Sequence, residues 1–146
     1  MATQHDDNEA LPQVALVLTS NLFFIPRIES AAIRSGMEAI YGNSAVGLLK
    51  STAGRDVALA LIDLETDEAV WEEGLSVLST ALKSKPGAGV DDHSVPSPII
   101  AYGPHGDAET LRKARRLGCD AVLTKRDFSS RLLELMGTRG QAVISS

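Results

Sequence analysis

The chain has 146 residues, of which 44% are hydrophobic, 23% charged and only 4% aromatic. This length fits a single domain whose core is filled by aliphatic side chains, as is usual in α/β proteins. The formal net charge of −5 argues against nucleic-acid binding, because phosphate contacts need clustered Lys and Arg. No apolar stretch reaches the ~18 residues of a membrane span, so we expect a cytoplasmic protein without a membrane partner. Cys119 is the single cysteine, which excludes an internal disulfide and predicts a packed thiol.

The chain divides into three parts by composition. Residues 1–12 are polar and end at a proline, which is typical of a flexible N-terminal arm. Residues 13–137 alternate apolar runs with helical patterns, so they are predicted to form one domain. Residues 138–146 show neither pattern and are predicted to form a loose C-terminal tail.

Five short apolar runs predict buried strands, since strands covered by helices on both faces carry few polar residues. The runs occupy residues 14–18, 39–41, 57–62, 98–102 and 121–123. Apolar residues at helical spacing follow each run and predict a helix there. This alternation implies an α/β fold, a three-layer doubly wound sheet of five parallel strands joined by right-handed crossovers.

The predicted helices each turn an apolar side to the core. Asn43 is predicted to cap the second helix and Asp107 the fourth, because both side chains accept hydrogen bonds from free backbone N–H groups. The last helix is predicted from about Asp127 to Gly137. The residues predicted to face the core are Trp71, Leu75, Leu78 and Leu82 in the third helix, Val46, Leu49 and Leu48 in the second, and Leu111, Ala114 and Leu117 in the fourth.

Ligands of doubly wound sheets bind at the carboxyl ends of the strands. We therefore expect any chemistry at this edge, where Asp63 closes the most apolar of the five runs. The polar and turn residues predicted to gather there are Thr19, Ser20, Asn21, Asp63, Gly103, Pro104, Thr124 and Lys125.

Three segments carry a resemblance to a known family. The run from Ala60 to Leu64 looks like a strand that ends in a phosphoacceptor aspartate, and the run from Ala114 to Lys125 looks like a helix, turn and strand that end in a lysine. The first strand and helix align without a gap. Over residues 14–136 the chain thus resembles the CheY-like receiver domains of two-component response regulators. The resemblance implies a flavodoxin-like sheet with strand order 2-1-3-4-5 and makes residues 13–137 a receiver-like domain.

The chain departs from the family at the phosphorylation site. Receivers hold Mg²⁺ with an acidic pair after the first strand, and the ungapped alignment places Ser20 and Asn21 there. They also place a hydroxyl at the end of the fourth strand, where this chain has Gly103. Asp63 and Lys125 are what remains of the site. Mg²⁺ binding is therefore expected to be weak or absent, and no other metal or cofactor is expected.

Asp63 and Lys125 at one strand edge are most simply explained as a structural ion pair. We therefore interpret the chain as an atypical receiver, or pseudo-receiver, that acts as a protein-interaction module in signalling, independently of phosphorylation and without enzymatic activity. Two alternatives stay open. One is a functional receiver phosphorylated on Asp63 in a two-component phosphorelay. The other is a sensor that binds a small anionic ligand at the turn from Gly103 to Asp107, ahead of a helix N-terminus.

Three arginines define a candidate partner surface. Arg112, Arg115 and Arg116 follow each other at i, i+3 and i+4, so they project from the same side of a helix. A solvated helix face explains the same spacing. As a contact surface, it would suit an acidic patch on a signalling partner or, in a homodimer, the acidic segment 65–73 of a second copy.

Overall fold

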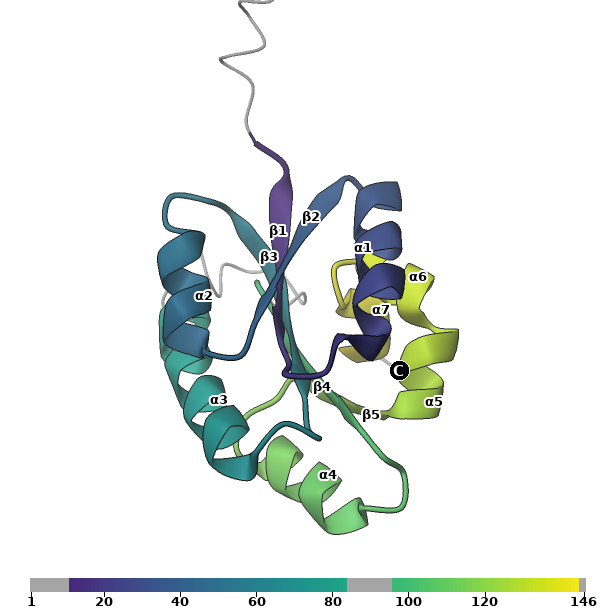
Figure 1. The fold of residues 1–146 in the computed structure, drawn as a ribbon. Helices are drawn as coiled ribbons and strands as arrows, with labels where there is room; N and C mark the ends of the chain where they lie inside the picture. The colour runs from purple at the N-terminus through teal and green to yellow at the C-terminus, as the bar shows by residue number, and fades with distance from the viewer. Residues whose placement is uncertain (1–10, 84–95, 145–146) are drawn as a thin grey trace, which may run out of the picture.

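The computed structural model describes residues 11–83 and 96–144. Its five parallel strands form one sheet in the order β2-β1-β3-β4-β5, with helices on both faces (Figure 1). The predicted fold class and strand order are confirmed. The strands are β1 (Gln13–Leu18), β2 (Met37–Gly42), β3 (Val57–Asp63), β4 (Ile99–Gly103) and β5 (Ala121–Thr124).

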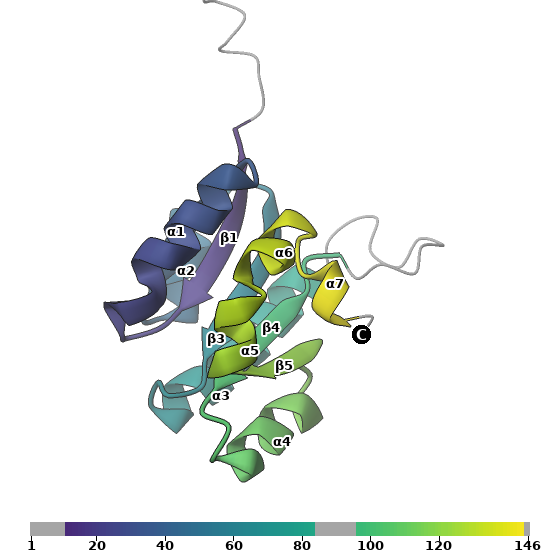
Figure 2. The same cartoon turned by 90° about the vertical axis from the view of Figure 1, so that its right-hand side faces the viewer.

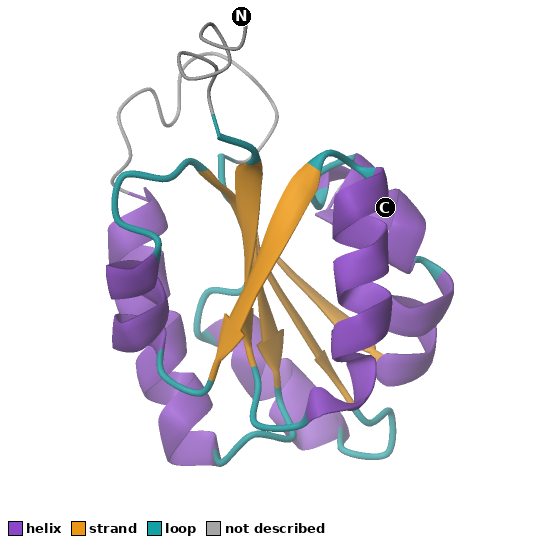
Figure 3. Cartoon of the chain, turned by 45° about the horizontal axis from the view of Figure 1, so that its top comes forward, coloured by secondary structure: helices purple, strands orange, loops and turns teal. Residues whose placement is uncertain are grey.

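The helices form two layers, and Figure 3 shows the strands between them. A 3-10 helix, η2 (Leu22–Phe24), leads into the first layer. Figure 2 shows that α1 and α6 lie side by side on this face. The first layer consists of α1 (Ile25–Arg34), α5 (Lys125–Ser130), α6 (Leu132–Gly137) and α7 (Gln141–Ile144). The second layer consists of α2 (Ala45–Ser51), α3 (Glu68–Lys83) and α4 (Ala108–Arg116).

The apolar runs arise because the inner strands are buried on both faces. In β1, Ala15 and Val17 pack in the core under α1, whereas Leu16 and Leu18 pack in the core under α3. Because successive side chains of a strand point to opposite faces, both sets must be apolar. On the second face the predicted stripe of α3 is confirmed, since Trp71, Leu75, Leu78 and Leu82 are all buried.

The start of α2 differs from the prediction by one residue. Ser44, and not Asn43, caps the helix, because its hydroxyl accepts a hydrogen bond from the Gly47 N–H at 3.1 Å. Ala45 and Leu48 are the residues of α2 that face the core, whereas Val46 is 46% exposed. The prediction that Val46 faces the core is wrong.

The fourth and last helices also differ in detail. Asp107 caps α4 as predicted, but the helix ends at Arg116 and the following Leu117 is exposed rather than buried. The last helix divides at Arg131, whose φ of −108° and ψ of 12° end α5. Backbone hydrogen bonds continue across the break, because Arg131 donates to Asp127 and accepts from Leu135.

The predicted C-terminal tail contains a short helix that the sequence did not indicate. Within residues 138–146, α7 forms a short helix and buries Val143 in the core under α1. Residues 1–10, most of the predicted arm, lie outside the described residues. None of the helices in the described ranges is long and apolar enough to cross a lipid bilayer.

Candidate functional site

Asp63 lies at the carboxyl end of β3, where the sequence places it, but its carboxylate is enclosed. Its side chain is buried, with only 3% of the residue exposed. The Thr19 hydroxyl donates to Oδ2 at 2.8 Å, and the backbone N–H of Glu65 donates to Oδ1 at 2.9 Å. Both oxygens of this buried group are therefore hydrogen bonded, as buried polar atoms require.

Thr19 is the residue after β1 that meets Asp63. Its backbone N–H donates to the Gly42 carbonyl at 2.9 Å and continues the sheet for one more bond, which turns the hydroxyl inward. Ser20 and Asn21, the aligned positions of the acidic pair, are exposed. The Asn21 side chain instead caps η2 by accepting from the Phe23 N–H. The sequence signal that could have identified Thr19 as the partner of Asp63 was its position directly after β1.

Gly103 closes β4 in a place with little room for a side chain. A Cβ atom there would lie 3.1 Å from the Leu64 Cβ and 3.4 Å from the Leu111 Cδ2. Serine or threonine would therefore require neighbouring side chains to shift. The hydroxyl that receivers use at this point is absent, and Leu64 and Leu111 fill the space around it.

Lys125 begins α5 at the same edge, but it does not pair with Asp63. Its ammonium forms an ion pair with Glu65 and lies 5.8 Å from the centre of the Phe24 ring. The predicted Asp63–Lys125 ion pair is wrong. Lys125 and Glu65 both keep part of their side chains in water, and pairing there avoids the cost of bringing an ammonium group to a buried carboxylate.

A cluster of three aromatic side chains lies beside Asp63. Tyr102 lies beside Asp63 in the register of β3 and β4, and its ring stacks on Phe128 with the centroids 4.0 Å apart and an angle of 7°. Phe24 meets both rings edge-on at 5.9 and 5.7 Å. Burial, and then the charge of Asp63, raise the pKa of the Tyr102 phenol far above its usual value. Sequence reasoning missed this cluster, because its members come from three separate elements.

The oxygen ligands at this edge do not match a receiver's magnesium site. Mg²⁺ prefers six oxygen ligands in near-octahedral geometry, usually including carboxylates. In residues 11–83 and 96–144, no three His, Cys, Asp or Glu side chains come together to hold a metal ion. Of the two carboxylates at the end of β3, Asp63 is hydrogen bonded and Glu65 is paired with Lys125. Weak or absent Mg²⁺ binding remains a prediction.

No protein-family model matches the chain, and no curated protein matches it in sequence. Solved structures do match it. It is similar to a response regulator from Thermotoga maritima at 13% identity and a TM-score of 0.65, covering 93% of this chain and 100% of that one. It is similar to full-length FixJ from B. japonicum at 15% identity and a TM-score of 0.62, covering 90% of this chain and 58% of FixJ.

A third similar structure comes from a complex. It is the co-crystal structure of the Saccharomyces cerevisiae histidine phosphotransfer signaling protein Ypd1 and the receiver domain of its downstream response regulator Ssk1. The match has 17% identity and a TM-score of 0.62, and it covers 91% of this chain and 94% of that one. At such identities the likeness establishes the fold, which is that of receiver domains.

The turn from Gly103 to Asp107 holds a carboxylate where an anion would bind. The Asp107 side chain accepts from the Thr110 N–H at 3.2 Å at the start of α4. A bound anion would have to compete with this negative charge for the free N–H groups of the helix. His105 is exposed beside the turn. Binding of a small anionic ligand remains a prediction that this capping disfavours.

The three arginines of α4 are all exposed. Arg112 and Arg116 line a groove of about 470 Å³ between α3 and α4. Arg115 lies on the side of α4 toward β5, where it donates to the Val122 carbonyl at 3.4 Å. The candidate partner surface of Arg112, Arg115 and Arg116 remains a prediction.

The acidic segment 65–73 is partly neutralised within the molecule. Lys113 of α4 forms ion pairs with Glu68 at 2.6 Å and with Glu72. These bonds to exposed carboxylates raise the pKa of Lys113 and keep it charged. Because Glu65 is also paired, this segment has less free negative charge to offer a second copy than its composition suggests.

Cys119 is a packed thiol, as predicted. It is buried in the core under α3, and burial raises its pKa to about 12. The reactive thiolate is therefore scarce at neutral pH, and the residue is not a candidate nucleophile.

Proposed function

We propose that this chain is a pseudo-receiver, a signalling module that binds a protein partner without phosphorylation of Asp63. The enclosed carboxylate carries the proposal, because Asp63 is 3% exposed and both oxygens already accept hydrogen bonds. Phosphoryl transfer needs an oxygen that can approach the phosphorus in line with the leaving group. Asp63 would have to lose the Thr19 hydrogen bond and become exposed before it could react.

Charge neutralisation is a second obstacle to phosphorylation. A transferred phosphoryl group needs cations around its oxygens, normally Mg²⁺ and basic side chains. At this edge Lys125 is held by Glu65, and Ser20 and Asn21 stand where receivers place the acidic pair that attracts a metal ion. We propose that the module has no catalytic activity of its own and functions in the cytoplasm.

The receiver fold supports a place for the chain in two-component signalling. The solved complex containing Ypd1 pairs a receiver domain with a phosphotransfer protein, which makes a protein partner the natural ligand to propose here. Arg112 and Arg116 offer exposed positive charge on α4, and an acidic partner would complement it.

A receiver phosphorylated on Asp63 is the second candidate function. One observation favours it: Asp63 still ends β3 at the sheet edge where α/β proteins bind ligands, with Lys125 at the start of α5 on the same edge.

Intact mass spectrometry separates the two candidates. The chain is incubated with Mg²⁺ and acetyl phosphate, next to the Asp63→Asn variant and a receiver domain of known competence as positive control. The proposal predicts no phosphoryl adduct on the chain while the positive control is modified. A stoichiometric adduct that disappears in Asp63→Asn would establish the working receiver instead.

A further inference from the structure

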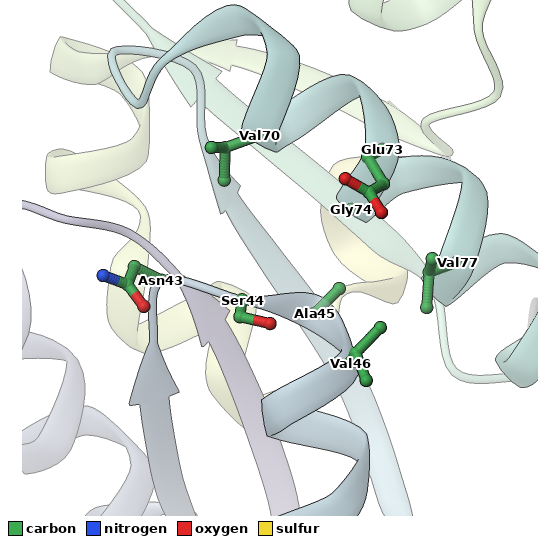
Figure 4. Close-up of a pocket in the computed structure, with 8 residues that line it drawn as sticks. All are labelled: Asn43, Ser44, Ala45, Val46, Val70, Glu73, Gly74 and Val77. Carbon is green, nitrogen blue, oxygen red and sulfur yellow. The ribbon is translucent and has the colours of Figure 1, made fainter.

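A groove separates α2 from α3, on the opposite side of α3 from α4. It has a volume of about 240 Å³, and four of its eight lining residues are apolar (Figure 4). Small-molecule sites usually occupy ~300 to 1,000 Å³, so this groove suits a single side chain better than a whole metabolite. The apolar lining residues are Ala45, Val46, Val70 and Val77, and the others are Asn43, Ser44, Glu73 and Gly74.

Gly74 sets the depth of the groove. A Cβ atom at this position would lie 2.4 Å from Leu18 Cδ2, closer than any real contact, so only glycine lets α3 approach β1 this closely. Leu18 is fully buried and has little room to move. The walls of the groove, Val46 from α2 and Val77 from α3, thus stand on a fixed floor.

Glu73 gives the groove a negative charge that none of the described residues neutralises. Glu68 and Glu72 on the same helix are both paired with Lys113. Glu73 follows Glu72 by one residue, about 100° further around the helix, and so faces α2 instead of α4. None of the residues lining the groove is basic, and Glu73 has no ion pair or hydrogen bond within the described ranges.

We propose that the α2–α3 groove docks a basic segment of a partner protein, which places one arginine or lysine side chain in it. The cationic head pairs with Glu73, while the methylene stem lies on Val46, Val70 and Val77. Long cationic side chains bind in this way, with an apolar stem on an apolar surface and the charge toward water. This surface is separate from Asp63 and from the α4 arginines, so the inference holds whether or not Asp63 is phosphorylated.

Amide NMR titration of the full chain tests the proposal. The probe is a capped pentapeptide with a central arginine between two leucines, and the matched peptide carries glutamate in the centre. The two variants are Glu73→Gln and Glu109→Gln, the latter an exposed acid on α4 that also lacks an ion pair within the described residues. Both positions are solvent exposed, so neither change should disturb folding.

The arginine peptide is expected to shift amides around the groove, from residues 43–46 and 70–77, and the glutamate peptide is not. Glu73→Gln should weaken binding about two- to fivefold, the size of one exposed ion pair, and Glu109→Gln should leave it unchanged. Equal binding of the two peptides, or no effect of Glu73→Gln, would overturn the proposal. Concentration-dependent shifts of the same amides without peptide would also overturn it, because a second copy would then be the occupant.

Discussion

Asp63 and Glu73 are both acidic residues of the central part of the chain, and their surroundings are opposite. Asp63 is buried at a strand end, and its two oxygens accept bonds from Thr19 and from the Glu65 backbone. Glu73 stands on a helix surface beside an apolar groove, with no partner in the described ranges. The difference shows that the residue at the expected catalytic position is the buried one, with a hydrogen bond already made to each of its oxygens.

The contrast follows from where each residue lies in the fold. A carboxylate at the carboxyl end of a buried strand must find donors within the protein, since leaving it unpaired there is costly. A carboxylate on a helix surface is solvated and keeps its charge free for a partner. The closed edge is thus held by hydrogen bonds within the protein, whereas the open groove keeps an exposed carboxylate, for which we propose a role in recognition.

Truncation of the aromatic cluster beside Asp63 should give the largest loss of stability. Phe128→Ala removes the ring stacked on Tyr102 and is expected to lower the free energy of unfolding by about 3 to 5 kcal/mol. Phe23→Ala is the matched control, because this phenylalanine is 73% exposed, and it should cost less than about 0.5 kcal/mol. Urea denaturation measures both, and similar losses would contradict a closed, tightly packed edge.

Removal of the Thr19 hydroxyl should destabilise the closed edge around Asp63. Thr19→Val keeps the shape but leaves Asp63 Oδ2 without its donor, which is expected to cost about 1 to 3 kcal/mol of stability. Thr19→Ser keeps the hydroxyl and should retain most of that bond. If valine and serine gave the same stability in urea denaturation, the hydrogen bond would have no part in holding Asp63.

Two glycines sharpen the account of the groove. Gly74→Ala should destabilise the chain by about 1 to 2 kcal/mol, since overpacking against Leu18 exceeds the gain in helix propensity. At Gly47 on α2 an added Cβ would lie 3.6 Å from its nearest neighbour, an ordinary contact, so Gly47→Ala should stabilise the chain by about 0.5 to 1 kcal/mol. Thermal unfolding should show a lower melting temperature for Gly74→Ala and a higher one for Gly47→Ala. Stabilisation by both changes would mean that Gly74 does not fix the floor.

Cys119 offers a test of burial by pH. Its pKa is raised from 9.0 to about 12 in the folded chain, so the unfolded thiol ionises first as the pH rises. Stability from this group is therefore complete below pH 9 and is lost between pH 9 and about 12, at about 1.4 kcal/mol per pH unit. Cys119→Ala should remove this part of the alkaline loss in urea denaturation. An unchanged pH profile in the variant would show that the thiol is not buried.

The sheet was predictable because its signal is local. The run from Val57 to Ile62 is apolar throughout, and the stripe of Trp71, Leu75, Leu78 and Leu82 has helical spacing. The exact start of a helix was harder to predict, as for α2, because the adjacent side chains of Asn43 and Ser44 can both cap a helix.

The partners in the candidate site were not predictable from the sequence. Lys125 could pair with either Asp63 or Glu65, and the choice depends on which carboxylate reaches the surface. Likewise Tyr102 and Phe128 meet only after β4 and α5 are packed on each other. Residue types at the strand ends showed where to look, whereas their hydrogen bonds required the folded structure.

The central claim is that Asp63 is held within the protein and does not form a metal-assisted phosphoacceptor site. Titration with Mg²⁺, followed through the amide NMR signals of Thr19 and Glu65, tests it most directly, because these two residues donate to the Asp63 carboxylate. The account predicts no saturable shift of either signal at millimolar Mg²⁺. Saturable shifts of both signals that vanish in Asp63→Asn would contradict it.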